Sequence, residues 1–210
     1  MDTKEVLRYL GYREADADEQ IISQIEHVLE EAAANINKKN VFGVWDCSSA
    51  QGNVTLGEMN VKSRDLARHL CGCNMAVLLA ATLGTGADNL LRRYNEQDME
   101  KALIAQAVCA SMIESYCDNV VNEASLSPRL EGLHPTSRFS PGYGDFDIIW
   151  QKEILKLLNC EKQIALTLTD GYMLIPSKSV TAVVGFGKEK TDNDENKCGR
   201  CTNTQCGYRR

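Results

Sequence analysis

The sequence predicts an α+β fold in which an antiparallel or mixed sheet packs with several helices, one of them long and central. Helical and strand-like segments follow one another without a repeating strand–helix–strand unit, which argues against a parallel α/β sheet. The 210 residues are 43% hydrophobic and 25% charged, the composition of an ordinary globular chain that can bury a core without disulfides. We expect one α+β body over residues 1–187, followed by a hydrophilic linker and a Cys-rich tail over residues 188–210.

The first part of the body, residues 1–79, contains helix and strand signals in succession. Apolar residues at helical spacing, with Asp16 or Asp18 as a cap, predict an amphipathic helix over residues 18–37. The other predicted elements are a strand over 41–46, a turn at Gly52-Asn53 into a second strand, a helix over 63–70 opened by Ser63, and a buried strand over 75–83.

The second part of the body contains the longest helix. Between Met99 and Val121 apolar residues occupy nearly every face, which predicts a helix surrounded by protein. A loop with three of the four prolines comes next. The elements that end the body are a helix over 146–158 and strands over 164–169, 173–175 and 179–185.

The long helix has one polar stripe. Ser111, Glu114, Ser115, Asp118 and Asn122 recur at steps of three and four residues and therefore share a face. This stripe is either the solvated side of the helix or the wall of a cavity. Glu114 is its most informative member, because a carboxylate on a buried helix must be paired or must face a cavity.

Two loops have the composition of ligand-binding turns. The first loop is Leu83-Gly-Thr-Gly-Ala-Asp88, in which Gly-x-Gly lies between an apparent strand and a helix. It is either a plain tight turn or a turn whose backbone amides contact a ligand. In Arg138-Phe-Ser-Pro-Gly-Tyr143, the Pro-Gly pair predicts a type II turn that holds the arginine and the tyrosine around a backbone arch. The arginine fork suits a carboxylate, although loops of this composition also have purely structural roles.

The second loop and the segment after it resemble a known family. Arg138 to Tyr143 fits the pattern Arg-x-x-Pro-Gly-Tyr. The later segment is similar to a Leu-Thr-Glu/Asp strand that leads to Met-x-Pro-x-x-Ser-Val-Ser/Thr. It reads Leu166-Thr-Leu-Thr-Asp-Gly-Tyr-Met-Leu-Ile-Pro-Ser-Lys-Ser-Val-Thr. Both patterns belong to the reactivation domain of cobalamin-dependent methionine synthase, which the chain resembles over residues 80–187. After Tyr143 the chain departs from the family pattern Pro-x-Cys-Pro-Asp-His and has Gly144-Asp-Phe-Asp instead.

The resemblance implies that the body binds S-adenosylmethionine (AdoMet) and presents its methyl group to a corrinoid whose cobalt has been oxidised by accident. An electron and the methyl group together would restore methylcobalamin. The ligand-binding residues implied by the resemblance are Arg138, Pro141, Gly142, Tyr143, Glu114 and Ser179.

The resemblance also implies partners. It is to a free-standing form of the domain, because the 210 residues contain no barrel or cobalamin-carrying domain. The chain would then be the reactivation component of a methyltransferase. Its partners would be a separate cobalamin-binding methyltransferase protein and an electron donor such as a flavodoxin or ferredoxin.

The tail predicts a metal site of its own. Cys198, Cys201 and Cys206 have C-x2-C-x4-C spacing, which can hold zinc or an iron–sulfur cluster if a fourth ligand comes from elsewhere. The same thiols could instead be free or redox-paired. The alternative function is therefore a corrinoid-protein chaperone or redox adaptor that uses this cluster and needs no AdoMet.

Charge and the N-terminal sequence exclude several classes of partner. Asp and Glu outnumber Lys and Arg by 29 to 23, so we expect no nucleic-acid partner. No stretch is apolar enough to span a membrane, and the start lacks the features of a signal peptide. We therefore expect a cytoplasmic protein without a membrane partner, whose nine cysteines are reduced thiols or metal ligands.

Overall fold

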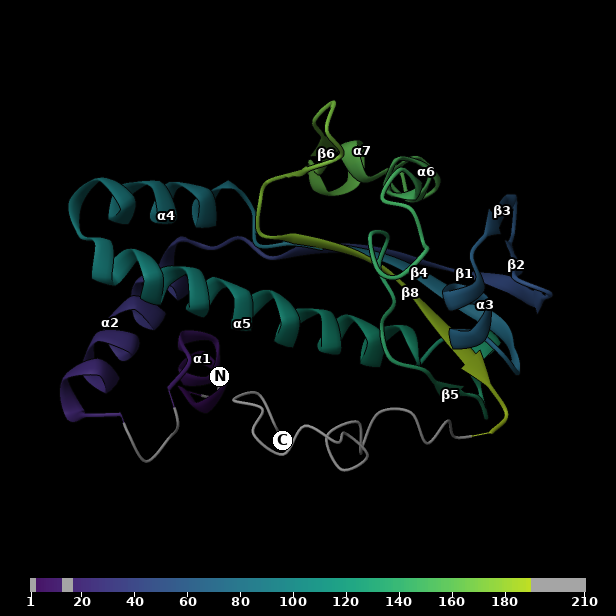
Figure 1. The fold of residues 1–210 in the computed structure, drawn as a ribbon, viewed down its shortest axis with the longest axis horizontal. Coiled ribbons are helices and arrows are strands. Elements are labelled where there is room, and N and C mark those ends of the chain that lie inside the picture. The colour runs from purple at the N-terminus through teal and green to yellow at the C-terminus, as the bar shows by residue number, and fades with distance from the viewer. Residues whose placement is uncertain (1–2, 13–16, 190–210) are drawn as a thin grey trace.

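The computed structural model describes residues 3–12 and 17–189, and it confirms the predicted α+β architecture (Figure 1). A six-stranded antiparallel sheet has the strand order β3-β2-β1-β4-β8-β5, and β6 pairs with β7 in a separate two-stranded sheet. The strands are β1 (Lys39–Ala50), β2 (Asn53–Leu56), β3 (Met59–Lys62), β4 (Cys73–Thr82), β5 (His134–Pro135), β6 (Thr167–Leu168), β7 (Leu174–Ile175) and β8 (Ser179–Gly187). The helices are α1 (Thr3–Leu10), α2 (Glu19–Asn35), α3 (Arg64–His69), α4 (Thr85–Gln97), α5 (Met99–Ala124), α6 (Trp150–Leu157) and α7 (Cys160–Ile164), with a short 3-10 turn at Pro128–Leu130.

Strand β4 lies at the centre of the molecule, because its alternate side chains enter two separate hydrophobic cores. Met75, Val77, Leu79 and Ala81 belong to one core, and Ala76, Leu78 and Ala80 belong to the other. A strand covered on both faces needs apolar side chains at every position. That requirement explains why this segment is a continuous apolar run rather than an alternating one.

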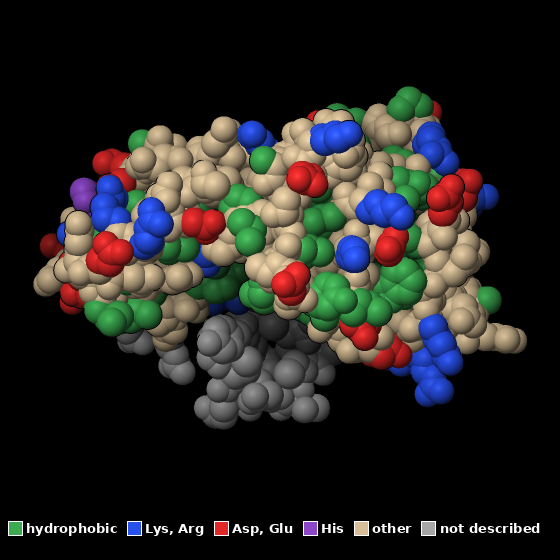
Figure 2. Space-filling view, turned by 90° about the horizontal axis from the view of Figure 1, so that it is seen from above, with side chains coloured by type: hydrophobic (Ala, Val, Ile, Leu, Met, Phe, Trp, Pro, Cys, Tyr) green, Lys and Arg blue, Asp and Glu red, His purple; other side chains and the backbone are tan. Residues whose placement is uncertain are grey.

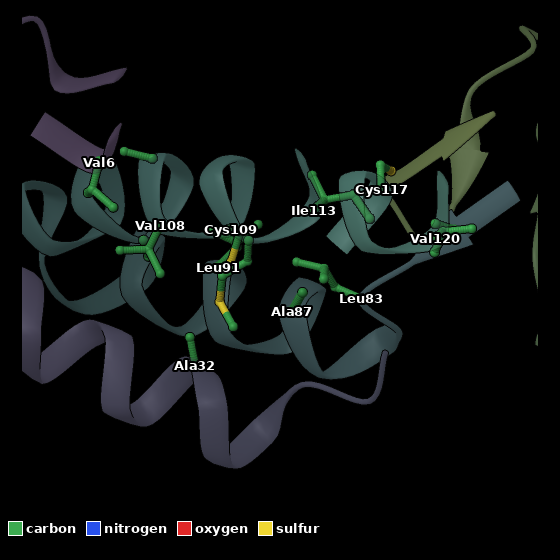
Figure 3. Packing of buried hydrophobic residues seen from close by; sticks show 14 of the residues in the cluster. Val6, Ala32, Leu83, Ala87, Leu91, Val108, Cys109, Ile113, Cys117 and Val120 are labelled. Atoms are coloured by element: carbon green, nitrogen blue, oxygen red, sulfur yellow. The ribbon is translucent and has the colours of Figure 1, made fainter. Parts of the chain in front are cut away.

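The first core lies between the sheet and helix α5, which runs along one face of the sheet with α1, α2 and α4 packed against it (Figure 1). Val6 of α1, Ala32 of α2 and Leu91 of α4 gather around Val108 and Cys109 of α5 (Figure 3). The predicted long helix is therefore confirmed. It is exposed near its start, however, where the side chains of Met99 and Leu103 are 72% and 61% exposed.

The second core lies on the opposite face of the sheet. It is formed by the β2–β3 hairpin and by α3, α6 and α7, with Phe146 fully buried among them. The two layers of helices place α5 and α3 on opposite sides of the sheet, so a site that needs both must lie at a sheet edge.

Local sequence signals set several of the element boundaries correctly. Asp18 caps α2 by accepting a hydrogen bond from the amide of Ile21 at 2.8 Å, and Ser63 caps α3 by accepting one from the amide of Leu66 at 3.0 Å. The predicted strand over 75–83 corresponds to β4, and the predicted strand over 179–185 is the larger part of β8.

The predicted helix over 146–158 begins too early. Helix α6 starts at Trp150, and the residues before it form turns in which the amide of Phe146 donates to the Tyr143 carbonyl oxygen at 3.0 Å. The Phe146 side chain enters the second core from a loop rather than from a helix face. Hydrophobic spacing alone does not distinguish these two cases.

The predicted strand over 164–169 is wrong in its first half. Cys160 and Ile164 are four residues apart and both buried, which is the spacing of helix α7. The helix ends at Ile164. The next residue, Ala165, has a φ of 55° in the left-handed region, and only Thr167–Leu168 are a strand. Elements α1, β3, β5 and α7 have no counterpart among the predicted segments.

We predict that a chain ending at Lys188 folds on its own. Strand β8 ends at Gly187, so this truncation keeps all the helices and strands that the structure describes. The truncated chain should retain a single cooperative thermal transition in circular dichroism. As a control, a chain ending at Val180 would lack most of β8 and should have no cooperative transition. Loss of cooperativity in the chain ending at Lys188 would make the tail part of the core.

Candidate functional site

The candidate site is a cavity of about 910 Å³ beside the starting half of strand β8. Its walls come from helices α1 and α5, from the loop that carries Arg138, from Gln151 of α6 and from Leu174 of β7. Ser179, Val180 and Thr181 of β8 line it as well. Its volume is within the range of about 300–1,000 Å³ that is usual for small-molecule sites.

The polar stripe of α5 forms one wall of this cavity. Ser111, Glu114, Ser115, Asp118 and Asn122 all line it. The stripe is thus a cavity wall, although its two carboxylates remain in contact with solvent: the side chains of Glu114 and Asp118 are 42% and 70% exposed.

Arg138 faces this stripe and pairs with both of its carboxylates. One guanidinium nitrogen donates to Asp118 and another to Glu114, and the side chain is only 19% exposed. Burial disfavours the charged guanidinium, but Asp118 and Glu114 outweigh this effect and raise the pKa of Arg138 above its ordinary value. A guanidinium has five N–H donors, so the fork keeps donors for a ligand carboxylate.

Helix α1 contributes a second charged group of residues, which the sequence analysis missed. Glu5, Arg8 and Tyr9 line the cavity, and Arg8 Nε donates to Glu5 Oε2 at 3.1 Å. The Arg8 guanidinium lies 4.8 Å from the centre of the Tyr9 ring. Burial and the nearby Glu114 raise the pKa of Tyr9, so its phenol keeps its proton. The sequence signal was present as Glu5 and Arg8 at i and i+3, next to the apolar pair Val6-Leu7.

The predicted turn after Arg138 is confirmed in geometry. The amide of Tyr143 donates to the Ser140 carbonyl oxygen at 3.1 Å, and Gly142 has a φ of 95°, which favours glycine. Ser140 and Tyr143 line the cavity, whereas Pro141 and Gly142 shape the turn and lie outside the lining. Tyr143 is 58% exposed and stands at the cavity mouth.

The wall opposite α5 is rich in hydroxyl and amide groups. Thr181 donates its hydroxyl to Gln151 Oε1 at 3.1 Å, and Gln151 Nε2 donates to the Tyr172 carbonyl oxygen at 2.8 Å. The hydroxyl oxygen of Ser179 lies 2.6 Å from the Pro176 carbonyl oxygen and 2.7 Å from the Thr82 hydroxyl oxygen. Ser179 therefore lines the site while its hydroxyl holds the start of β8.

Taken together, the cavity carries both signs of charge. Three carboxylates (Glu5, Glu114 and Asp118) and two guanidinium groups (Arg8 and Arg138) line it, among several hydroxyl groups. Such a lining suits a ligand that has one anionic group, more positive than negative charges, and hydroxyl groups. Each charged group of the ligand can then pair with a side chain of opposite charge.

The Gly84-x-Gly86 turn serves packing rather than this site. A Cβ atom on Gly86 would lie 1.9 Å from the carbonyl oxygen of Asn35, and one on Gly84 would lie 2.9 Å from that of Asn37. Both glycines therefore let α4 start directly against the end of α2. Neither lines the cavity, which favours the plain-turn alternative.

A second cavity, of about 610 Å³, lies between the β2–β3 hairpin and α6. Met59, Trp150 and Tyr172 give it apolar walls, and Lys152 and Glu153 contribute charges of both signs. On the face drawn in Figure 2, basic and acidic side chains are interspersed rather than gathered by sign. Glu58 and Lys156 line this second cavity too, but unlike the first cavity it has no arginine among the described residues of its lining.

The six cysteines in the described part of the chain are free thiols. Burial raises the pKa of Cys47, Cys117 and Cys160 to about 12 and that of Cys109 to about 11, which makes these thiols unreactive. Over residues 3–12 and 17–189, no group of three or more His, Cys, Asp or Glu side chains could hold a metal ion. Likewise, no helix in that part of the chain is long and apolar enough to cross a membrane.

The three tail cysteines, Cys198, Cys201 and Cys206, lie outside the described residues. The zinc or iron–sulfur site predicted there therefore stays a prediction.

Comparison with known proteins matches the chain to a family model and to solved structures. Residues 72–210 match a family model described as "Vitamin B12 dependent methionine synthase, activation domain", which covers well over half of the chain. A crystal structure of the MetH reactivation domain bound to AdoHcy matches with a TM-score of 0.58 and 14% sequence identity, over 80% of this chain and 67% of that one. At this identity, the structural match shows a shared fold. None of the curated proteins matches the chain.

We predict that metal bound by the full-length chain is held by the tail. Elemental analysis of the purified chain should find zinc or iron, and the double variant Cys198→Ser, Cys201→Ser should lose it. The matched control is Cys71→Ser, because Cys71 is the exposed thiol of the described residues and should have no effect on metal content. Metal that remains in the double variant would place the site elsewhere.

Proposed function

The chain belongs to the family of vitamin B12-dependent methionine synthase activation domains, and from this premise we propose that it binds AdoMet beside Arg138 for the reductive remethylation of cobalamin carried by a partner methyltransferase. The observation that carries the proposal is the position of Arg138 between Glu114 and Asp118 in one cavity. The family supplies the ligand class, and the side chains of this chain supply the fit.

The amino-acid end of AdoMet matches this arrangement group by group. Its carboxylate can take free N–H donors of Arg138, and its ammonium can take oxygens of Asp118 or Glu114. The hydroxyl and amide groups on the wall opposite α5, such as those of Thr181 in β8 and Gln151 in α6, suit the ribose hydroxyls and adenine nitrogens. AdoMet also has a sulfonium, which gives it one net positive charge to balance the carboxylate excess of the cavity.

The partner's corrinoid supplies the methyl-accepting cobalt, and an electron donor of the flavodoxin or ferredoxin class supplies the electron. The residues of this chain hold and orient the methyl donor. The amino-acid group is fixed by Arg138, so the rest of the ligand has a fixed direction in the cavity. Any gain in rate then comes from proximity and orientation rather than from acid–base chemistry.

The mouth of the cavity suits the approach of a protein partner. Tyr143 is 58% exposed there, and Met173 and Ile175, which flank the cavity-lining Leu174, are 69% and 47% exposed. Exposed apolar side chains beside a polar cavity are typical of a contact surface. We assign this rim to contact with the cobalamin-binding methyltransferase.

Calorimetric titration with AdoMet tests the proposal directly. The wild-type chain should bind AdoMet and, mixed with an oxidised corrinoid methyltransferase and a reductant, should support the absorbance change of remethylation. A chain that binds no AdoMet would overturn the proposal. That result would favour the chaperone or redox adaptor that uses the tail cysteines.

We predict that Arg138→Ala weakens AdoMet binding strongly. Loss of a charge-assisted contact to a desolvated carboxylate costs about 2–5 kcal/mol, which corresponds to at least about 30-fold in the dissociation constant. Arg138→Lys should fall between the wild type and Arg138→Ala, because lysine keeps the charge but not the planar fork. Remethylation should follow the same order.

The matched control for Arg138 is Arg92→Ala, which removes an arginine of α4 that pairs with Asn89 outside the cavity. It should bind AdoMet as the wild type does. Full affinity in a folded Arg138→Ala variant would remove Arg138 from the site.

We predict that Glu114→Gln weakens AdoMet binding by about 5- to 20-fold, a moderate loss because its carboxylate is partly solvated. The loss should be smaller for AdoHcy, because the charge of Glu114 attracts both the ammonium and the sulfonium of AdoMet, and AdoHcy has only the ammonium. Titrations of both ligands measure this difference, and Glu123→Gln, an exposed position of α5 outside the cavity, is the control. Unchanged AdoMet affinity in Glu114→Gln would show that this carboxylate does not contact the ligand.

A further inference from the structure

The loop that carries Arg138 and Tyr143 is held from outside the cavity. We propose that helix α3 positions this loop for ligand binding. The contacts are made by Asp65 and His69 of the helix and by Asp145 of the loop. The inference rests on the proposed function, since the affected property is affinity for AdoMet. None of the described residues that line the cavity belongs to α3, so α3 would act only through the loop.

The first anchor joins the loop to the start of α3. The Asp145 carboxylate accepts a hydrogen bond from the Ser63 hydroxyl. It also accepts from the amides of Arg64 and Asp65, at 2.8 and 3.0 Å. The Ser63 hydroxyl and these two amides hold the pKa of Asp145 below its ordinary value, so the residue is ionised in the folded chain. Asp145, about 80 positions further along the chain, thus accepts hydrogen bonds from the first free amides of the helix.

The same anchor is reciprocal and requires a glycine. The amide of Asp145 donates to Asp65 Oδ2 at 3.2 Å, so each aspartate binds the other's segment. Gly144 has a φ of 54°, and a Cβ atom there would lie 2.3 Å from Asp65 Oδ2. A side chain at position 144 would therefore be strained in its backbone and would displace the Asp65 carboxylate from this contact.

The second anchor joins the other end of α3 to the start of the loop. His69 Nε2 lies 2.8 Å from the Ser137 carbonyl oxygen, and because a carbonyl only accepts, this nitrogen carries the proton. The His69 ring also lies 4.9 Å from the ring of Phe139, measured between centroids. Arg138 is therefore in a segment whose two ends are fixed to one short helix.

The two anchors have a thermodynamic consequence for binding. A loop already held in its binding conformation loses less conformational entropy when the ligand arrives. Without Asp145, the segment that follows Tyr143 would gain freedom that ligand binding must then remove. Asp145 is accordingly a positioning residue that acts through Arg138 and Tyr143.

The test compares Asp145→Ala and Asp145→Asn with the wild type by calorimetric titration with AdoMet, at a temperature where thermal unfolding shows every variant to be folded. We expect Asp145→Ala to lose at least about fivefold in affinity, and Asp145→Asn, which keeps an acceptor oxygen, to fall between them. Global stability does not change the affinity of molecules that are already folded. A purely structural role would therefore leave the affinity unchanged.

The matched control is Asp147→Ala, which removes the same charge from the same segment. Its carboxylate accepts from the Ile149 amide at 3.0 Å, within its own turn and away from α3. Affinity should stay within about twofold of the wild type.

A double variant tests the route through Arg138. When Asp145→Ala is added to Arg138→Ala, the further loss of affinity should shrink to less than about twofold, because the two residues act on one contact. Equal losses in the presence and absence of Arg138 would overturn the proposed route.

A ligand-free measurement separates this inference from the proposed function. The amides of Tyr143 and Phe146 are hydrogen-bonded within the loop, and their hydrogen exchange should speed up in Asp145→Ala while that of Val108 in α5 does not. Unchanged exchange at Tyr143 and Phe146 overturns the anchor whether or not AdoMet binds. Faster exchange with no AdoMet binding by the wild type overturns the proposed function alone. Faster exchange with full affinity in Asp145→Ala overturns the positioning role.

Discussion

The burial of β4 on both faces is the constraint on which the rest of the structure depends. Every side chain from Met75 to Ala81 is at most 8% exposed, so each face of the sheet needs its own layer of helices. The layer of α5 and the layer of α3, α6 and α7 therefore never touch through the sheet. They approach each other only around its edge, and the β8 side is where the Arg138 loop crosses from β5 to α6 (Figure 1).

This geometry explains the chemistry of the cavity. Side chains from α5 reach it from one layer, and Gln151 of α6 reaches it from the other. A site at the boundary of two cores can hold charged groups that are partly desolvated yet paired, as Arg138 is with Glu114 and Asp118. The same pairing explains how one guanidinium stays charged at 19% exposure without a ligand.

Features that depend on local spacing could be predicted from the sequence. The apolar run of β4, the cap of α2 by Asp18, the polar stripe of α5 and the turn after Arg138 each follow from residues close together in the chain. Features that depend on distant contacts could not. Nothing within α1 indicates that Glu5 meets α5 more than 100 residues later, and nothing around Asp145 indicates that it caps α3. Helix α7 was not predicted because its five residues have only two apolar positions, Cys160 and Ile164, which are too few to show a helical period.

The cavity is built from residues at both extremes of the described chain, Glu5 in α1 and Thr181 in β8. During synthesis, α1 leaves the ribosome early, but its final neighbours in the site appear only when β8 follows. Until then β4 pairs with β1 alone, and its other edge is open in a strand made almost wholly of apolar residues. Open apolar edges of this kind readily pair with other chains, so the risk of aggregation is greatest before β8 is synthesised. The order of the sheet thus makes β8, the last of the described strands to be translated, the one that closes both the sheet and the ligand site.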